Sequence, residues 1–381
     1  MKQGWEIKKI GEVCCKKQQI ARATKKYTPS DNIAYIDISA IDSATNEIME
    51  PTILRFQDAP SRAQQVVEKD DILVSLVRPN LKNIAQVNES REDLVASSGF
   101  CVLRTKENPR YIRYVVLGER FTNYLISRTS GANYPAVREE DIKEYPIPIP
   151  PLPEQEKIVS ELDCLSGLIE KKRQQLKELD ALAQSIFYEM FGNPVENERG
   201  WEVKKIGEIA DFYNGAAHEG EISSDGKYCV VNSKFISSNG LVRKFCDSQI
   251  FPLLKNDIVM VMSDVPNGKA LAKCYVIEDT DKYTLNQRIC VFRNYNADTI
   301  YLYYCLNRNP YYLRFDNGNG QTNLRKNDVL NCPIILPPLP LQQTFAQKVE
   351  AIEKQKELIK QSIIEAETLL ASRMQYYFEE G

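Results

Sequence analysis

Histidine is nearly absent from this sequence, and with it the residue pattern of a zinc protein. His218 is the only histidine, and the ten cysteines include the adjacent Cys14 and Cys15 but no C-x-x-C pair. Structural zinc sites need clustered Cys and His ligands, so no metal site is expected. Scattered cysteines of this kind are typical of reduced, mostly buried thiols in a cytoplasmic protein.

Long apolar runs and a strong net charge are also missing. No run approaches the roughly 20 apolar residues of a membrane span, and residues 1–9 lack the apolar core of a signal peptide. We therefore expect a cytoplasmic protein with no membrane partner. The net charge is only −3 at pH 7, which disfavours a chain that coats DNA unaided, so any DNA-binding surface must be a local patch.

Proline-rich segments precede two long amphipathic runs. Prolines at 146, 148, 150, 151 and 153 predict an extended segment, and we expect a helix to begin only after the last of them. From Ile158 to Met190, apolar residues recur at spacings of four and three, which indicates a heptad seam that only Lys172 interrupts. Gly192, Asn193 and Pro194 predict its end.

The same run occurs twice, because adding 187 to each seam position gives a second amphipathic run from Phe345 to Tyr377. A ten-residue segment is also repeated: Gly4–Val13 returns as Gly200–Ile209 with only Val/Ile exchanges. The chain is therefore an internal duplication. We expect Trp5 and Trp201 to anchor the start of each half by packing.

Further matches lie inside the halves. Tyr35–Ile41 corresponds to Cys229–Ile236, and both segments predict a strand followed by a turn, with Asn239-Gly240 as an explicit turn signal. Asp71–Ser75 and Cys101–Arg104 correspond to Asp257–Val261 and Cys290–Arg293, which predicts buried strands in both halves. The loops between these strands differ. The sequence thus predicts an α+β protein with two similar mixed domains, each followed by a long helix, and the two helices pairing with each other.

The whole chain resembles the specificity subunit of a type I restriction-modification system. The resemblance is carried by Pro150–Gln155 before the first heptad run, by Phe191–Pro194 before Gly200–Glu202, and by the duplicated layout. The second copy departs from the pattern, with Leu341 in place of the acidic residue and Phe345 in place of Ile158.

The resemblance implies a division of labour along the chain. Residues 1–150 and 193–337 would be target recognition domains, each recognising one half of a bipartite, asymmetric site in double-stranded DNA. Residues 151–192 and 338–381 would form an antiparallel coiled coil that sets the spacer and docks two methyltransferase subunits. Restriction translocase subunits would join that complex. It implies no catalytic residue and no cofactor in this chain, with S-adenosylmethionine, ATP and Mg on the partner subunits.

Polar loop residues are the candidates for recognising DNA, because Arg can bind guanine through two donors and Asn or Gln can bind adenine. Ordinary surface solvation is the competing interpretation for each of them. The candidates are Arg78, Asn80, Lys82, Asn83, Asn133 and Arg138 in the first half, and Lys234, Asn267, Lys269, Gln287, Arg288, Gln321, Asn323 and Arg325 in the second.

The seam residues are the candidates for coiled-coil and partner contacts. They are Ile158, Leu162, Leu165, Ile169, Leu176, Leu179, Ile186, Phe345, Val349, Ile352, Ile359, Ile363 and Leu370. Lys172, Lys356 and Arg373 interrupt the seams, where they would extend towards solvent or fix the register, or contact methyltransferase subunits. Further apolar residues flank the seams and would pack on the domains or dock partner helices: Leu168, Leu182, Phe187, Leu358, Leu369, Met374 and Phe378.

Two other functions compete with this interpretation. A self-contained methyltransferase needs a glycine-rich cofactor loop and an Asn-Pro-Pro-aromatic motif, and Asn309–Tyr312 lacks the second proline. The acidic group Glu68–Asp71 is better explained as a solvated turn than as a catalytic site. A purely structural coiled-coil adaptor would leave no DNA footprint.

Overall fold

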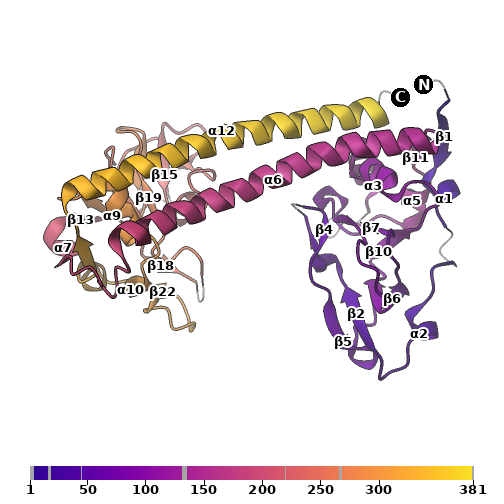
Figure 1. Cartoon of the computed structure of the whole chain (residues 1–381), viewed down its shortest axis with the longest axis horizontal. Coiled ribbons are helices and arrows are strands. Elements are labelled where there is room, and N and C mark those ends of the chain that lie inside the picture. Colours follow the sequence, from indigo (N-terminus) through magenta and orange to yellow (C-terminus); the bar gives the residue numbers. More distant parts are fainter. Residues whose placement is uncertain are drawn as a thin grey trace. The chain divides into compact units, whose positions relative to one another are not determined.

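The computed structural model describes residues 4–15, 19–43, 45–130, 135–218, 220–265 and 268–379 (Figure 1). Two of the candidate residues, Asn133 and Asn267, lie outside this range. The chain divides into two compact units: Met1–Arg173 with Gln361–Gly381 is unit 1, and Gln174–Lys360 is unit 2. Among the described residues, no helix has both the length and the apolar character to cross a membrane.

Unit 1 contains the first mixed domain. Strands β5, β2, β9 and β6 form one sheet, in which β2 and β9 are parallel, and β10, β7 and β8 form an antiparallel sheet. Its elements are β1 Glu6–Lys9, α1 Ile10–Val13, α2 Ala23–Lys26, β2 Asn32–Ile36, η2 Ile38–Ala40, β3 Ile41–Asp42, β4 Glu47–Ile48, β5 Thr52–Arg55, η3 Phe56–Asp58, β6 Ala63–Val66, β7 Ile72–Ser75, η4 Pro79–Leu81, β8 Ile84–Gln86, β9 Leu94–Ser97, β10 Phe100–Leu103, α3 Pro109–Leu117, α4 Glu119–Arg128, α5 Glu139–Lys143 and β11 Pro146–Ile149.

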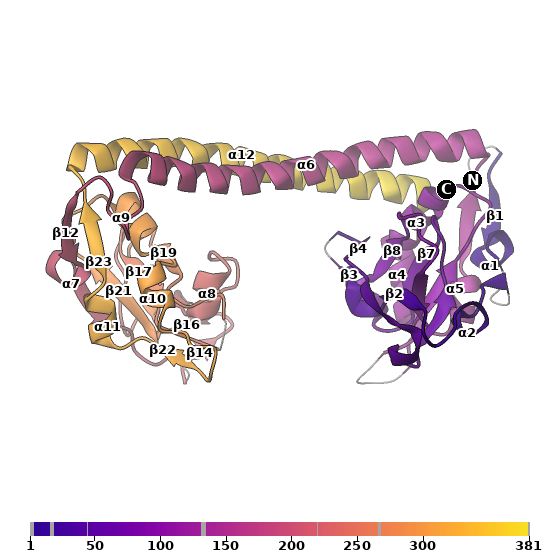
Figure 2. The ribbon, with the colours of Figure 1, turned by 60° about the horizontal axis from the view of Figure 1, so that its bottom comes forward.

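Unit 2 repeats this plan. Strands β14, β16, β15 and β20 form one sheet, in which β15 and β20 are parallel, and β13, β21, β17 and β19 form an antiparallel sheet (Figure 2). Its elements are β12 Glu202–Lys205, α7 Ile206–Ile209, β13 Asp211–Asn214, β14 Ile222–Ser223, β15 Tyr228–Val231, α8 Ser233–Ser237, β16 Phe245–Cys246, β17 Ile258–Val261, β18 Ser263–Asp264, β19 Cys274–Val276, β20 Tyr283–Leu285, β21 Ile289–Arg293, α9 Thr299–Leu306, α10 Pro310–Leu313, β22 Thr322–Asn323, α11 Lys326–Leu330 and β23 Pro333–Leu336.

The predicted duplication is confirmed for the central strands of both sheets, whereas the edge strands β6, β13 and β14 differ between the units. Strands β7 and β17 are buried along their whole length, as their apolar runs predict, and they pair with β10 and β21. The segments after β2 and β15 form short helices, η2 and α8, and Asn239 and Gly240 then turn the chain at φ 51° and 79°. Trp5 is 7% exposed within the core of the first domain, so its predicted packing role is confirmed.

The two long helices each contribute to both units: α6 spans Leu152–Phe191 and α12 spans Leu339–Phe378. The expectation that a helix begins only after the prolines is wrong, because α6 includes Pro153 and α12 includes Pro340. Proline is tolerated in the first turn of a helix, where its missing N–H would have no intrahelical partner. The predicted end is confirmed, since α6 stops at Phe191 and Gly192 has φ 77°.

Contacts within each unit show that α6 and α12 pair in antiparallel fashion. In unit 1, Glu161 of α6 bonds to Arg373 of α12, and Arg173 bonds to Glu367. In unit 2, Asp180 bonds to Lys356, and the rings of Phe187 and Phe345 meet at 5.5 Å. No seam residue of either helix is exposed, including Lys172, Lys356 and Arg373. The heptad pattern therefore predicted the contact face.

The flanking apolar residues divide into two groups. Phe187 and Phe378 are buried in the cores of their domains, and Met374 packs against the core of unit 1. Four leucines remain exposed on the helix surfaces: Leu168 (42%), Leu182 (46%), Leu358 (73%) and Leu369 (50%).

The interpretation of Glu68–Asp71 as a solvated turn is wrong for Asp71, which is 1% exposed. Its carboxylate accepts two hydrogen bonds from Arg104, at 2.8 and 2.7 Å, and one from the backbone N–H of Glu68. Unit 2 repeats the pair with Asp257 and Arg293. A buried carboxylate requires such partners, and the sequence did not reveal them because Arg104 is far away in the chain, directly after the neighbouring strand β10.

Candidate nucleic-acid interface

In unit 1 the candidate residues follow the end of β7. Arg78 has φ 49°, a left-handed conformation that is strained for a residue with a side chain. Its backbone N–H donates to Pro135 O at 2.8 Å, and Val77 pairs with Ala136. These contacts bring the loop after β7 beside the segment that carries Arg138. Exposed residues on this surface include Arg78, Asn80 and Arg138.

Lys82 and Asn83 are half-buried at the far end of the same loop. The backbone carbonyl of Lys82 accepts a bond from Asn46 at 2.6 Å, and its ammonium pairs with Glu119. The backbone carbonyl of Asn83 accepts a hydrogen bond from Ser75 N of β7 at 3.0 Å. These contacts hold the loop in shape, and a phosphate would have to compete with Glu119 for Lys82.

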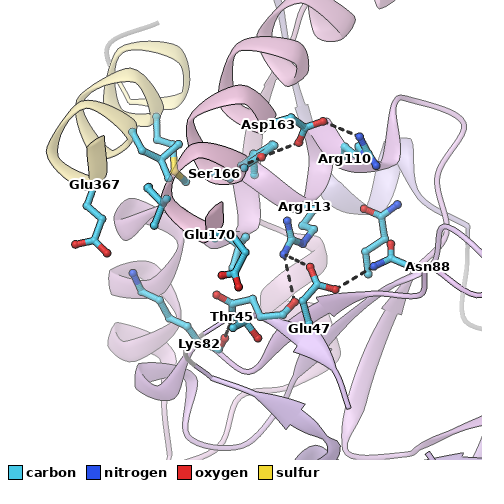
Figure 3. Close-up of a pocket in the computed structure, with 18 of the residues that line it drawn as sticks. Thr45, Glu47, Lys82, Asn88, Arg110, Arg113, Asp163, Ser166, Glu170 and Glu367 are labelled. Carbon is cyan, nitrogen blue, oxygen red and sulfur yellow. Dashed lines mark hydrogen bonds and ion pairs between the residues drawn. The ribbon is translucent and has the colours of Figure 1, made fainter. Parts of the chain in front are cut away.

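A polar groove of about 800 Å³ lies next to this loop within unit 1 (Figure 3). Arg113 reaches Glu47 at 3.4 Å, and Arg110 reaches Asp163 of α6 at 2.6 Å. The lining contains four basic residues and four acidic ones: Lys82, Arg110, Arg113 and Arg173, and Glu47, Asp163, Glu170 and Glu367. Because these charges balance, the groove lacks the cationic excess of a phosphate site.

In unit 2 the corresponding surface is a two-stranded ribbon of β18 and β22. Ser263 pairs with Asn323, and Asp264 pairs with Thr322. Met262 lies between two further segments, because its N–H donates to Arg288 O and its carbonyl accepts from Leu324 N. The fold thus brings together Gln321, Asn323, Arg325 and Arg288, which are exposed.

The other candidates of unit 2 lie around or apart from this ribbon. Lys269 is exposed in the loop after β18. Asp264 holds this loop in place, because its carboxylate accepts hydrogen bonds from the N–H groups of Ala270 and Leu271. Gln287 is half-buried beside Arg288. Lys234 is exposed on α8, an element that packs on β15 and β17.

Arg138 and Arg325 occupy equivalent positions before short helices. Each backbone N–H donates to an aspartate three residues later, Asp141 or Asp328, at 2.9 Å. The aspartates cap α5 and α11. The Arg138 side chain is 81% exposed and lies 3.5 Å from the Asp141 carboxylate. The backbone is therefore fixed while the guanidinium remains accessible.

Sequence reasoning missed several residues of the unit 2 surface. Ser263 was overlooked because a lone serine carries no signal, and only the β18–β22 register places it opposite Asn323. Asn317 and Asn319 are exposed and line a cavity of about 380 Å³ together with Gln321, Asn323 and Arg325. The concentration of amides in residues 317–323 was a signal that could have identified them.

Residues that might suggest catalysis have structural roles. Asn309 caps α10 through a bond from Tyr311 N and donates to Cys305 O. Both ring nitrogens of His218 have partners, Ala216 O and Thr284 Oγ1, at 2.8 and 2.9 Å. Burial raises the pKa of the Cys14 thiol to about 12 and that of Cys229 to about 11. Thiols with such a pKa are poor nucleophiles at neutral pH.

Comparison with known proteins indicates the same duplicated organisation. The family described as the type I restriction modification DNA specificity domain matches residues 2–181 and again residues 198–368. The MjaIX type I restriction enzyme specificity subunit of Methanocaldococcus jannaschii is 25% identical over 395 residues, which cover 91% of this chain and 86% of that protein.

Solved structures of other chains are similar to this one over nearly its whole length. A chain solved in work on complex assembly and conformational transition of the type I R-M system is 26% identical, with a TM-score of 0.61, and the match covers 98% of this chain and 97% of that chain. The S subunit of the type I restriction-modification system from M. genitalium shares the fold at 14% identity, with a TM-score of 0.52 and coverage of 98% and 96%.

Proposed function

The chain belongs to the type I restriction modification DNA specificity family, and we propose that it selects the DNA sites on which a type I restriction-modification complex acts. In this role it is a non-catalytic specificity subunit with two target recognition domains. Each domain recognises one half of a bipartite, asymmetric DNA site.

The observation that carries this proposal is a shared scaffold with different loops at equivalent places. The buried pairs Asp71–Arg104 and Asp257–Arg293 are the same in both domains. At the tip of the scaffold, however, Val77 and Ala136 of unit 1 correspond to Ser263 and Asn323 of unit 2. Identical supports with different exposed side chains are what two domains need if they recognise different base sequences.

The long helices support a role in setting the spacer between the two half-sites. Each helix has 40 residues, and at about 1.5 Å per residue it is about 60 Å long. At about 3.4 Å per base step, this length corresponds to at most about 18 base pairs of DNA. Two short half-sites about one helical turn apart fit within that limit.

Partner subunits complete the proposed complex. The chain acts with methyltransferase and restriction translocase subunits, and we infer two methyltransferase subunits, one for each half of the duplicated chain. S-adenosylmethionine, ATP and Mg would then be bound by these partners, and this chain would hold no cofactor. Because its substrate is the DNA inside the cell, we place the complex in the cytoplasm.

The test is a base-resolution methylome of cells that express this chain with its methyltransferase subunit. The expected result is a single split motif, with methylated adenines in both half-sites and a fixed spacer. Cells that express the methyltransferase alone are the control and should lack that motif. A continuous motif, or none, would contradict the proposal, and the absence of any motif would favour a structural adaptor.

A further inference from the structure

Three polar side chains of unit 2 form a directed chain of hydrogen bonds on the β18–β22 ribbon. Gln321 Nε2 donates to Ser263 Oγ at 2.8 Å, and Ser263 Oγ donates to Asn323 Oδ1 at 2.7 Å. The backbone places them together: Ser263 and Asn323 are register partners, and Gln321 is two residues before Asn323, on the same face of the strand. We call these three residues the amide relay.

The serine hydroxyl has one proton, so it donates to one of the two amides and accepts from the other. Because Ser263 Oγ donates to Asn323 Oδ1, it has no proton for Gln321 and can only accept from Gln321 Nε2. Two groups are then turned away from the serine. Among the residues that the structure describes, Asn323 Nδ2 has only a long 3.5 Å contact to Gln321 O and remains a donor, and Gln321 Oε1 is an acceptor.

A donor beside an acceptor matches the major-groove edge of adenine. Adenine presents N7 as an acceptor and N6–H₂ as a donor, whereas guanine presents two acceptors, N7 and O6. Asn323 Nδ2 can donate to N7 while Gln321 Oε1 accepts from N6. The same pair opposite guanine would place Gln321 Oε1 against O6, two acceptors without a proton between them.

We propose that Ser263 is a positioning residue which fixes the Gln321 and Asn323 amides so that the second domain recognises an adenine in its half-site. This inference rests on the proposed function and adds to it the base, the two contacting residues and the group that orients them. Exposed Arg325 lies two residues after Asn323, where it can bind a phosphate that flanks that base.

The first domain offers a matched comparison, because it has the same backbone pairing without the polar side chains. Val77 and Ala136 occupy the positions of Ser263 and Asn323, and neither can form such a relay. Any adenine recognised by the first domain must therefore be recognised through other residues. A change at Val77 controls for a general disturbance of this part of the fold.

The experiment compares methylomes of cells that express the full chain with its methyltransferase subunit. The variants are Ser263→Ala, which removes the hydroxyl, Ser263→Thr, which keeps it, and Val77→Ala as the control. The wild-type chain should prefer adenine over the other bases on the order of 5- to 150-fold at one position of one half-site. Ser263→Ala should reduce this preference to a few-fold. Ser263→Thr should keep the motif, and Val77→Ala should leave this half-site unchanged.

The outcomes separate this inference from the proposed function. A wild-type split motif that Ser263→Ala leaves unchanged at every position would overturn the relay and leave the proposed function standing. Loss of the adenine preference in Ser263→Thr, which keeps the hydroxyl, would also overturn the relay. A wild-type chain that directs no split motif would contradict the proposed function itself.

A binding measurement covers the case in which Ser263→Ala does not assemble. The purified complex is titrated with its duplex site, in which 7-deazaadenine replaces the adenine in question and so removes N7. The wild-type complex should lose affinity for this duplex, and an Asn323→Ala complex should show no further loss. An equal loss in both complexes would show that Asn323 does not contact N7.

Discussion

At the scale of single residues, several buried polar contacts occur once in each domain. Gln155 Nε2 donates to Pro150 O and Gln342 Nε2 donates to Pro337 O, both at 2.8 Å. Their Oε1 atoms accept from the backbone N–H of Asn108 and Asp298, which cap α3 and α9. The glutamine of the proline-rich motif thus joins the start of a long helix to its own domain. This glutamine therefore contributes to the fold of the domain, whether or not a partner subunit also contacts it.

The buried Asp–Arg pairs predict a large loss of stability on substitution. Asp257 is 2% exposed, and Asp257→Ala removes the carboxylate that accepts from the Arg293 guanidinium and from the Leu254 N–H. Loss of one partner of a buried ion pair costs about 3–5 kcal/mol. We expect urea unfolding of the full chain to show an early transition of unit 2.

The matched control for this prediction is the surface pair of Arg91 and Asp93, whose side chains are 36% and 35% exposed. Asp93→Ala should cost at most about 1 kcal/mol. Equal effects of Asp93→Ala and Asp257→Ala would show that burial does not determine the importance of these pairs.

Arg78 and Arg288 are expected to contact bases, because both are exposed at the tips of their domains in a strained backbone conformation. Arg78→Ala should weaken DNA binding by the assembled complex by about 1–3 kcal/mol and relax one position of the first half-site. Arg288→Ala should do the same in the second half-site. Arg55→Ala, at an exposed position on β5, is the control. An unchanged affinity and motif would exclude a base contact.

At the scale of elements, the two charged residues on the seam of α12, Lys356 and Arg373, have defined partners. Lys356 bonds to Asp180 and Glu353, both at 2.7 Å. Arg373 bonds to Glu161 through both Nε and Nη2, and Tyr377 donates to the same carboxylate. The pairs of Lys356 with Asp180 and of Arg373 with Glu161 cross between the helices, and they favour a single register over a slip by a turn.

The pairing of Glu161 predicts a pH dependence. Hydrogen bonds from Arg373, and then from Tyr377, hold the pKa of the Glu161 carboxyl below its usual value. A carboxyl whose pKa falls on folding stabilises the folded state above its unfolded pKa of about 4.3, and this contribution is lost as the pH falls through the folded pKa. Unfolding of unit 1 should become easier below about pH 4.5.

The measurement is the urea midpoint of unit 1 between pH 3 and pH 7 for the wild type and for Glu161→Gln. The amide cannot ionise, so the difference between the two chains should shrink towards acid pH. Glu156→Gln, at an exposed position of the same helix within unit 1, is the control and should follow the wild type. A constant difference across the range would contradict this role of Glu161.

At the scale of the whole molecule, the proposed function makes the long helices a spacer of defined length. Their seams follow a repeat of seven residues, so insertion of one heptad preserves the contact face. One heptad adds about 10.5 Å to a helix, which is about three base pairs.

The variant carries one heptad inserted in each long helix, after Arg173 in α6 and before Gln361 in α12, at the boundary of the two units. We expect it to recognise the same half-sites with a spacer about three base pairs longer. The methylome of cells that express this variant with its methyltransferase measures the spacer directly. An insertion of one heptad in α6 alone is the control and should abolish methylation, because the seams no longer match. An unchanged spacer would show that the helices do not set it.

The sequence by itself determined the duplication, the two long helices and the face on which they pair. These features depend on local patterns, such as the apolar period and the repeat of Gly4–Val13 at Gly200–Ile209, which are visible without knowledge of distant contacts. The tertiary structure decided which polar residues meet. Arg104 reaches Asp71 from the residue after β10, and Ser263 reaches Asn323 only through the pairing of β18 with β22. Such contacts join residues that are far apart in the chain, and no single-residue pattern encodes them.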